Sequence, residues 1–252
     1  MSNRTTATTA SLIFAAAAAL AASPATGQDL PDAHDLVARH AEAVNARRLN
    51  ERGFIHTHGT FSIPGMGTSG ELDVLQAAPN RMAMKMSMQG LGEIRSGFDG
   101  TVGWSVNPME GPRLMQGPEL LQLQDEADFG VNTRDSALIA SMKTIDRIEL
   151  EGRTCYKVEL QWKSGRTTYD CYDTETGLLT AAMYKAHTAM GALDALVLYQ
   201  DYRDFEGVRL ATSSIQKVFG QQLVMTIAWA RFDPIDSAAF ELPAEIKALV
   251  TR

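Results

Sequence analysis

The chain of 252 residues is predicted to be an α+β protein whose main element is an antiparallel β-sheet. After one amphipathic helical segment near the start, apolar residues recur at every second position from Phe54 almost to the end, as in strands with one buried face. Turn residues separate these runs at short intervals, which is typical of antiparallel hairpins. So few helices leave part of one apolar sheet face uncovered.

Residues 1–27 are expected to be a secretory signal peptide. A charge at Arg4 is followed by an apolar, alanine-rich run, and small residues precede a cleavage point at Gln28. We therefore expect an exported, periplasmic protein that is not lipid-anchored, with residues 28–252 forming a single domain. Loss of Arg4 with the leader changes the formal net charge from −7 to −8, and this acidity argues against nucleic acid as a partner.

Three segments are candidates to cover the sheet. The spacing of apolar residues predicts an amphipathic helix over Pro31 to Ala46. A second helix is expected over Pro118 to Ala127, where proline suits the first turn and Leu120 and Leu123 share a face. A short stretch from Ala137 to Met142 is the third candidate.

The period-two runs predict twelve strands. They are expected over Phe54 to Ile63, Glu71 to Gln76, Arg81 to Gln89, Glu93 to Phe98, Val102 to Asn107, Thr144 to Leu150, Tyr156 to Trp162, Thr167 to Tyr172, Leu179 to His187, Leu193 to Tyr202, Val208 to Phe219 and Leu223 to Phe232. Strict alternation predicts one apolar face in three of them: Val102, Trp104 and Val106; Tyr156, Val158, Leu160 and Trp162; and Leu223, Met225, Ile227 and Trp229.

Four methionines alternate along one predicted strand, at Met82, Met84, Met86 and Met88. Because strand side chains alternate between faces, these thioethers form one row. Methionine adapts to irregular apolar shapes, so the row is interpreted as an ordinary core, as a wall of an apolar cavity, or as soft-metal ligands.

Copper is the metal alternative, because His56 and His58 also share a strand face and lie close to the methionines in sequence. The parity of Ile55, Phe61 and Ile63 puts the two histidines on the solvent side. The methionine row is expected on the opposite, inner side, which weighs against a shared site.

Cys155 and Cys171 flank one predicted hairpin. An oxidising compartment favours a disulfide, but a two-residue turn at Ser164-Gly165 would place Val158 opposite Cys171 and leave Cys155 on the other face. A bridge would then need a bulge or a longer loop, and both redox states remain open.

No catalytic signature is found. The sequence has no paired-histidine zinc helix, no phosphate-binding glycine loop and no nucleophile elbow. Carboxylates at Asp170, Asp173, Asp201 and Asp204 are interpreted as solvated turn residues. We expect neither an enzyme nor a cofactor.

Four stretches in order, Ala78 to Met82, Phe98 to Pro108, Asp201 to Leu210 and Asp233 to Pro243, resemble the exported family of outer-membrane lipoprotein-sorting proteins, relatives of the periplasmic carrier LolA. The resemblance spans nearly the whole mature chain. It implies a curved, incompletely closed β-barrel, or half-barrel, whose concave apolar face is covered by helices and holds acyl chains.

The function expected from this resemblance is that of a non-enzymatic carrier or chaperone. Its cargo would be the acyl chains of lipoproteins or lipids, and its partners membrane-bound donor and acceptor proteins. A sensor or binding module for a lipid or a protein is the main alternative. The residues expected to line the cavity are Met82, Met84, Met86, Met88, Ile94, Phe98, Val102, Trp104 and Val106, with Leu120 and Leu123 on the covering helix.

Overall fold

The computed structural model describes residues 30–88, 90, 92–134, 136–188 and 191–251. The expected leader, residues 1–27, lies outside these ranges. Thirteen strands are described: β1 Phe54–Ile63, β2 Thr68–Ala77, β3 Arg81–Met88, β4 Gly92–Phe98, β5 Gly103–Asn107, β6 Gly111–Leu114, β7 Ile139–Leu150, β8 Arg153–Trp162, β9 Thr167–Asp173, β10 Leu179–Thr188, β11 Gly191–Phe205, β12 Val208–Val218 and β13 Gln221–Arg231.

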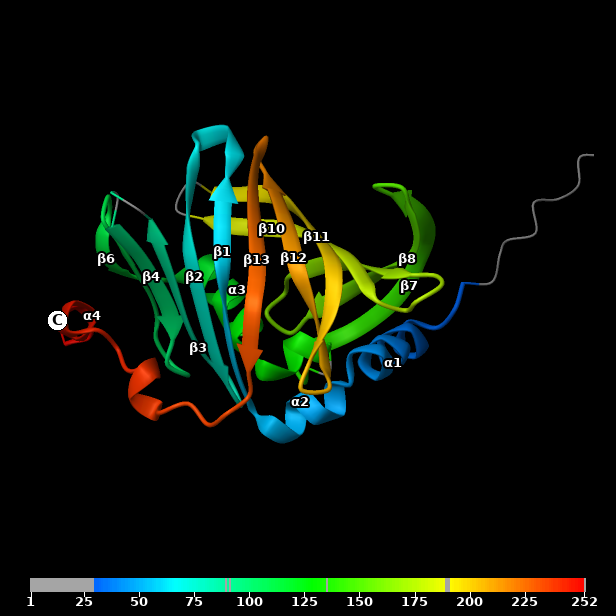
Figure 1. The fold of residues 1–252 in the computed structure, drawn as a ribbon, viewed down its shortest axis with the longest axis horizontal. Coiled ribbons are helices and arrows are strands. Elements are labelled where there is room, and N and C mark those ends of the chain that lie inside the picture. The colour runs from blue at the N-terminus through cyan, green and yellow to red at the C-terminus, as the bar shows by residue number, and fades with distance from the viewer. Residues whose placement is uncertain (1–29, 89, 91, 135, 189–190, 252) are drawn as a thin grey trace, which may run out of the picture.

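All thirteen described strands belong to one antiparallel sheet with the order β6-β5-β4-β3-β2-β1-β13-β12-β11-β10-β9-β8-β7. The sheet curves strongly around an interior, and its edge strands β6 and β7 do not pair with each other (Figure 1). The predicted fold class, an incompletely closed antiparallel half-barrel with helices, is therefore confirmed.

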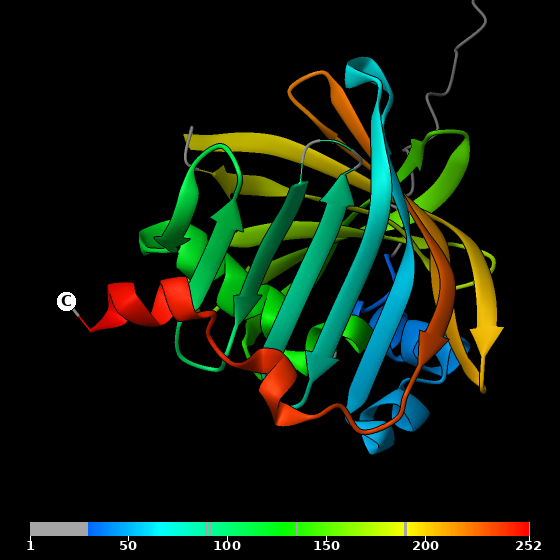
Figure 2. The ribbon, with the colours of Figure 1, turned by 60° about the vertical axis from the view of Figure 1, so that its left-hand side comes forward.

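The helices lie on both sides of this sheet. They are α1 Ala33–Val44, α2 Ala46–Arg52, α3 Gly117–Ala127 and α4 Ala244–Val250, with 3-10 turns η1 Pro64–Met66, η2 Phe129–Thr133 and η3 Ser237–Phe240. Helices α1 to α3 and η2 lie on the concave side, whereas η3 and α4 cross the outer face of the first strands (Figure 2). Among the described residues, no helix has the length and apolar character needed to cross a membrane.

The N-terminal helix differs from its prediction in one detail. Asp32 caps α1 by accepting a hydrogen bond from the backbone N–H of His34 at 2.7 Å. The expected single helix is broken at Asn45, whose φ of 56° belongs to the left-handed region that ends helices. After this break, α2 leads directly into the start of β1 at Phe54. The stretch from Ala137 to Met142 does not cover the sheet as expected, because residues 139–142 form the start of β7.

Three apolar clusters join the covering elements to the concave face. Leu36 of α1 packs with Val158 and Leu160 of β8, in agreement with the predicted face of that strand. Leu49 of α2 packs with buried residues of β1, β12 and η2. Helix α3 packs Leu123 against Phe98 of β4.

A bulge changes the face of Trp229. The β1–β13 register pairs Gly59 with Ile227 but His58 with Trp229, so Ala228 is an extra residue on β13. Ile227 therefore faces inward and Trp229 lies on the outer face with His58. The predicted common face of Leu223, Met225, Ile227 and Trp229 is wrong at Trp229 for this reason.

The hairpin between β8 and β9 has three loop residues rather than two. The backbone N–H of Trp162 donates to Arg166 O at 2.9 Å, and Gly165 takes the positive φ of 86° that such a loop requires. The longer loop pairs Lys157 with Cys171, which puts Cys155 and Cys171 on one face. They form a disulfide with a Cα separation of 5.4 Å.

Candidate functional site

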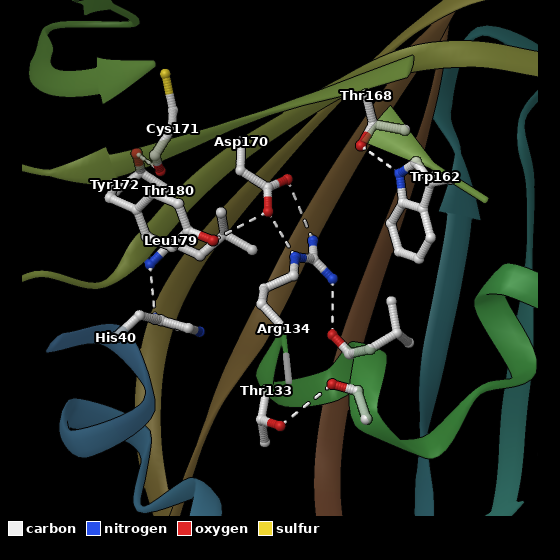
Figure 3. A network of polar contacts seen from close by, with 12 residues as sticks. His40, Thr133, Arg134, Trp162, Thr168, Asp170, Cys171, Tyr172, Leu179 and Thr180 are labelled. Carbon is white, nitrogen blue, oxygen red and sulfur yellow. Dashed lines mark hydrogen bonds and ion pairs between the residues drawn. The ribbon is translucent and has the colours of Figure 1, made fainter. Parts of the chain in front are cut away.

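A cavity of about 460 Å³ lies between the concave face of the sheet and the elements that cover it, α1, α2, α3 and η2, which are together called the cover. Its walls are apolar where β1, β2 and β12 meet α2, with Leu49, Ile55, Val74 and Val208 among the lining residues. The side toward β9 to β11 is polar, and Figure 3 shows the contacts that organise it. The site therefore combines an apolar volume with a buried polar wall.

Arg134 and Asp170 are the centre of the polar wall. Arg134 follows η2 with a φ of 59° and enters the cavity from the cover. Its Nε donates to Asp170 Oδ2 at 2.5 Å and its Nη1 to Val131 O at 2.8 Å (Figure 3). Asp170 is 1% exposed, and Tyr172 Oη donates to the same carboxylate at 3.1 Å. A buried carboxylate of this kind is satisfied only by such charged and hydroxyl donors.

His40 extends this cluster toward α1. Its Nδ1 accepts a hydrogen bond from the backbone N–H of Leu179 at 3.2 Å, and its ring lies against Tyr172 with a centroid separation of 5.6 Å. Burial, together with the positive charge of Arg134, lowers the pKa of His40 to about 4. The imidazole is therefore neutral at neutral pH, as an accepting Nδ1 requires.

A second ion pair joins α3 to the β8–β9 loop. Arg166 Nη1 and Ser164 Oγ both donate to Asp125 Oδ2, at 2.9 and 2.7 Å. The next residue, Glu126, accepts from Gln122 Nε2 at 2.8 Å, and burial raises its pKa. The cover is thus held to the sheet by charge pairs at two points.

Three tyrosines, Tyr184, Tyr199 and Tyr202, complete the polar wall. Burial raises the pKa of each, so all three phenols stay protonated. The Tyr202 hydroxyl donates to Leu179 O at 2.7 Å. These groups offer hydrogen bonds to a polar part of a bound molecule, whereas Asp170 and Asp125 are already engaged by guanidinium groups.

The methionine row lies on the concave face, one strand beyond the cavity wall. The register pairs Met84 with Val74 and Met82 with Gln76, and both partners line the cavity. Met82 packs under α3 with Phe98, Leu120 and Leu123. Met84, Met86, Met88 and Ile94 continue along the same face and remain partly exposed.

The structure corrects the placement of Trp104 and Val106. On β5 these residues pair with Gly97 and Arg95, whereas Phe98 pairs with Gly103. Trp104 and Val106 therefore lie on the outer face, because the β4–β5 register sets them opposite to Phe98 and the methionine row. Val102 precedes β5 and is half-buried.

The two histidines also lie on the outer face, as their parity predicts. His56 Nε2 and His58 Nδ1 lie 3.2 and 3.1 Å from Asp73 Oδ1. Both rings contact Trp229, and the two hydrogen bonds lower the pKa of Asp73 against the opposing effect of its burial. The separation of these imidazoles from the methionine row on opposite faces is confirmed.

Sequence reasoning missed the polar wall. The interpretation of Asp170 as a solvated turn residue is wrong, because this side chain faces the cavity between Thr168 and Tyr172. The interpretation holds for Asp173, which accepts hydrogen bonds from the turn at Thr176. One signal in the sequence could have identified Asp170. It lies two residues before Tyr172 in the same predicted strand, so the two side chains share a face.

No protein-family model matches the sequence, and no curated protein matches it. Solved structures do match in fold. A LolA superfamily protein from Nitrosomonas europaea has a TM-score of 0.57 at 12% identity, covering 84% of this chain and 99% of that chain. A DUF1329 family protein from Desulfovibrio piger has a TM-score of 0.54 at 14% identity, covering 82% and 97%.

An outer membrane lipoprotein-sorting protein domain from Vibrio parahaemolyticus has a TM-score of 0.50 at 11% identity, covering 86% of this chain and 100% of that chain. These likenesses extend over almost the full length of the solved chains. They establish that this chain has a LolA-like fold, as its sequence resemblance implied.

Proposed function

We propose that this chain, which has the fold of LolA superfamily structures, is a non-enzymatic periplasmic carrier that binds acyl chains of lipoproteins or lipids. The observation that carries the proposal is the continuous concave face formed by the cavity wall at Val74 and the methionine row beside it. Helix α3 covers only the Met82 end of that row. The partly exposed remainder extends the apolar volume beyond the cavity.

Such a surface supplies affinity without a fixed shape. Each methylene removed from water contributes about 0.8 kcal/mol, so a partly buried acyl chain gains several kcal/mol. Methionine side chains adapt to chains of different length. The hydroxyl groups of Tyr184 and Tyr199 would meet the polar end of the cargo.

Native mass spectrometry of protein purified without detergent tests the proposal. Bound lipid is expected as mass adducts, and Met86→Lys is expected to remove them because it puts an ammonium group on the concave face. The matched control is Ser87→Lys on the same strand. Ser87 faces outward between Glu71 and Glu93 in register, so a lysine is accommodated there and the adducts should remain.

Transfer separates a carrier from a binding module. Protein loaded with a fluorescent acyl chain is mixed with acceptor vesicles, and a carrier is expected to deliver the chain. Loading without delivery would favour the sensor alternative. The proposal would be overturned if the folded protein showed no lipid adducts and took up no acyl probe.

A further inference from the structure

The hairpin turns at one end of the sheet differ in character from those at the other end. Because neighbouring strands are antiparallel, the β1–β2, β5–β6 and β12–β13 turns lie at one end, and the β7–β8 and β11–β12 turns at the opposite end. We call the first three turns, residues 64–67, 108–110 and 219–220, the upper rim (Figure 2). The β8–β9 loop at the same end is held to α3 through Ser164 and Arg166.

The upper rim carries the three most exposed large apolar side chains of the described part of the chain. Met109 is 93% exposed, Phe219 84% and Met66 68%, whereas the next, Val250, is 47% exposed. Single exposed apolar residues are common on protein surfaces. These three, however, lie in three different hairpin turns at the same end of the sheet. Their shared position indicates a shared partner.

The geometry of its turn does not explain the exposed phenyl ring of Phe219. The two-residue loop Phe219-Gly220 has φ values of 48° and 72°, positive at both positions as in a type I′ turn. At the opposite end, Glu151-Gly152 has 51° and 77°, and Glu206-Gly207 has 53° and 84°. The same conformation therefore accepts glutamate twice in this chain. A positive φ also disfavours a bulky side chain, so phenylalanine is an unfavourable choice for the turn alone.

The upper rim also carries little charge. Glu110 is the one charged residue in its three turns, all of which the structure describes, and Arg113 Nε lies 3.6 Å from the Glu110 carboxylate. The two-residue turns at the opposite end instead carry Glu151 and Glu206, in a chain with a formal net charge of −7. Moving a charge out of water is costly. The upper rim is therefore the end of the sheet that can enter an apolar phase at low cost.

A lipid surface fits this arrangement. The β5–β6 turn is separated from the β1–β2 turn by β3 and β4 in the sheet order, so the exposed side chains are spread along the rim. A bilayer interface accepts separate apolar groups together, because a fluid surface requires no matching shape. The partner that these observations favour is a bilayer.

We infer that the upper rim docks on the surface of a lipid bilayer, with Met66, Met109 and Phe219 inserted in the interfacial region. The methionine row leads toward this rim, because Met82 lies under α3 and Met88 pairs with Gly70 near the β1–β2 turn. Under the proposed carrier function, on which this step alone rests, an acyl chain passes between the bilayer and the cavity along the row. Docking itself requires no bound cargo.

Flotation with phosphatidylcholine vesicles tests the docking, with protein purified from the periplasm so that the expected leader is absent. The unaltered chain is expected to float with the vesicles. Phe219→Glu should bind about tenfold more weakly, because the phenyl ring no longer leaves water, and Met109→Ser on another hairpin about threefold more weakly. Phe219→Glu should fold, since glutamate occupies two turns of the same conformation. The matched control Glu206→Gln changes such a turn at the opposite end and should bind as the unaltered chain does.

Tryptophan fluorescence locates the contact. Phe219→Trp places an indole on the upper rim, and Glu206→Trp places one in the matching turn at the opposite end. Vesicles that contain brominated phosphatidylcholine are expected to quench the added emission of Phe219→Trp and to leave that of Glu206→Trp unchanged. The unaltered chain supplies the background from its own tryptophans.

The inference would be overturned if the unaltered chain did not float, or if Phe219→Glu and Met109→Ser bound vesicles as tightly as it does. Equal quenching of the two tryptophan variants would also contradict it. So would loss of binding in about 0.5 M sodium chloride, because salt screens attraction between charges and does not weaken apolar insertion.

The acyl probe separates this inference from the carrier proposal. Uptake of the probe without vesicles should be the same in Phe219→Glu and in the unaltered chain, because Phe219 lies outside the concave cavity. A chain that docks on vesicles and takes up no probe would count against the carrier proposal alone. A chain that takes up the probe and does not dock would count against the inference alone.

Discussion

The Nε of Arg134, beside the cavity cover, donates to Oδ2 of Asp170 on β9 at 2.5 Å, and both side chains are largely enclosed. This ion pair joins the covering segment to the sheet across the cavity (Figure 3). Burial makes the pair costly to form and more costly to leave half-formed. It is therefore suited to hold the cover in one position until both charges separate together.

Removal of one partner should be strongly destabilising. Asp170→Ala leaves the buried guanidinium without its carboxylate and Tyr172 without its acceptor, so we expect the free energy of unfolding to fall by about 3–5 kcal/mol. Urea denaturation followed by circular dichroism measures the change. The control Asp194→Ala removes an aspartate paired with Lys185 whose side chain is 88% exposed, and its expected effect is within about 0.5 kcal/mol. Equal effects would show that the buried pair is unimportant.

The decrease in the free energy of unfolding as the pH falls should depend in part on His40. The pKa of His40 is about 4 in the folded protein, against 6.5 for the free side chain. The folded state therefore binds fewer protons, and stability that is full above pH 6.5 is lost as the pH falls toward 4. This group accounts for about 3 kcal/mol of that loss.

The measurement compares unfolding free energies at pH 7 and pH 4 in the unaltered chain and in His40→Gln, whose amide oxygen is expected to accept from Leu179 N–H. The variant should lose about 3 kcal/mol less across this range. The comparison removes the contribution of carboxylates common to both proteins. Parallel losses in the two proteins would contradict a neutral buried imidazole.

The Cys155–Cys171 disulfide should contribute to stability, because it closes a loop with a sequence separation of 16 residues. Loop-closure entropy predicts about 3 kcal/mol. The double variant Cys155→Ala with Cys171→Ala is expected to unfold at lower urea, and reductant should lower the midpoint only in the unaltered chain. If reductant also lowered the urea midpoint of the double variant, the effect of reductant would not come from this disulfide.

Alternation along the strands predicted the sheet well, because each strand has one packed face over most of its length. It failed where the two-residue period was interrupted. The extra residue Ala228 turned Trp229 outward, and the three-residue loop ending at Gly165 changed the partner of Cys171. Single-residue insertions reverse all faces beyond them, and their presence depends on pairing with a strand distant in sequence.

The polar wall was beyond sequence reasoning for a different reason. Arg134 and Asp170 lie 36 residues apart, and no local period links a residue after a 3-10 turn with one inside a strand. The predicted face of Trp104 is wrong because both faces of β5 carry buried residues. One face lies under α3 and the other under the C-terminal segment. Periodicity identifies a single covered face and becomes ambiguous when both faces are covered.

Exposed apolar side chains at the β1–β2 and β12–β13 turns, which form one rim of the sheet, should assist transfer of the acyl cargo to an acceptor membrane under the carrier proposal. Met66, between β1 and β2, is 68% exposed, and Phe219, between β12 and β13, is 84% exposed. The two tips are neighbours, because Gly65 lies against Gln221, two residues after Phe219. Exposed apolar groups at one edge favour contact with a lipid surface.

Phe219→Ser should therefore slow transfer of a bound fluorescent acyl chain to vesicles by about threefold to tenfold, since the free energy of burying a phenyl ring in the interface is lost. Binding of the acyl chain itself should not change, because the tip lies outside the concave cavity. The matched control Gln222→Ser alters an exposed polar residue near the same turn and should leave the rate unchanged. Equal transfer rates for the unaltered chain and Phe219→Ser would mean that the cargo leaves without contact between this rim and the acceptor membrane.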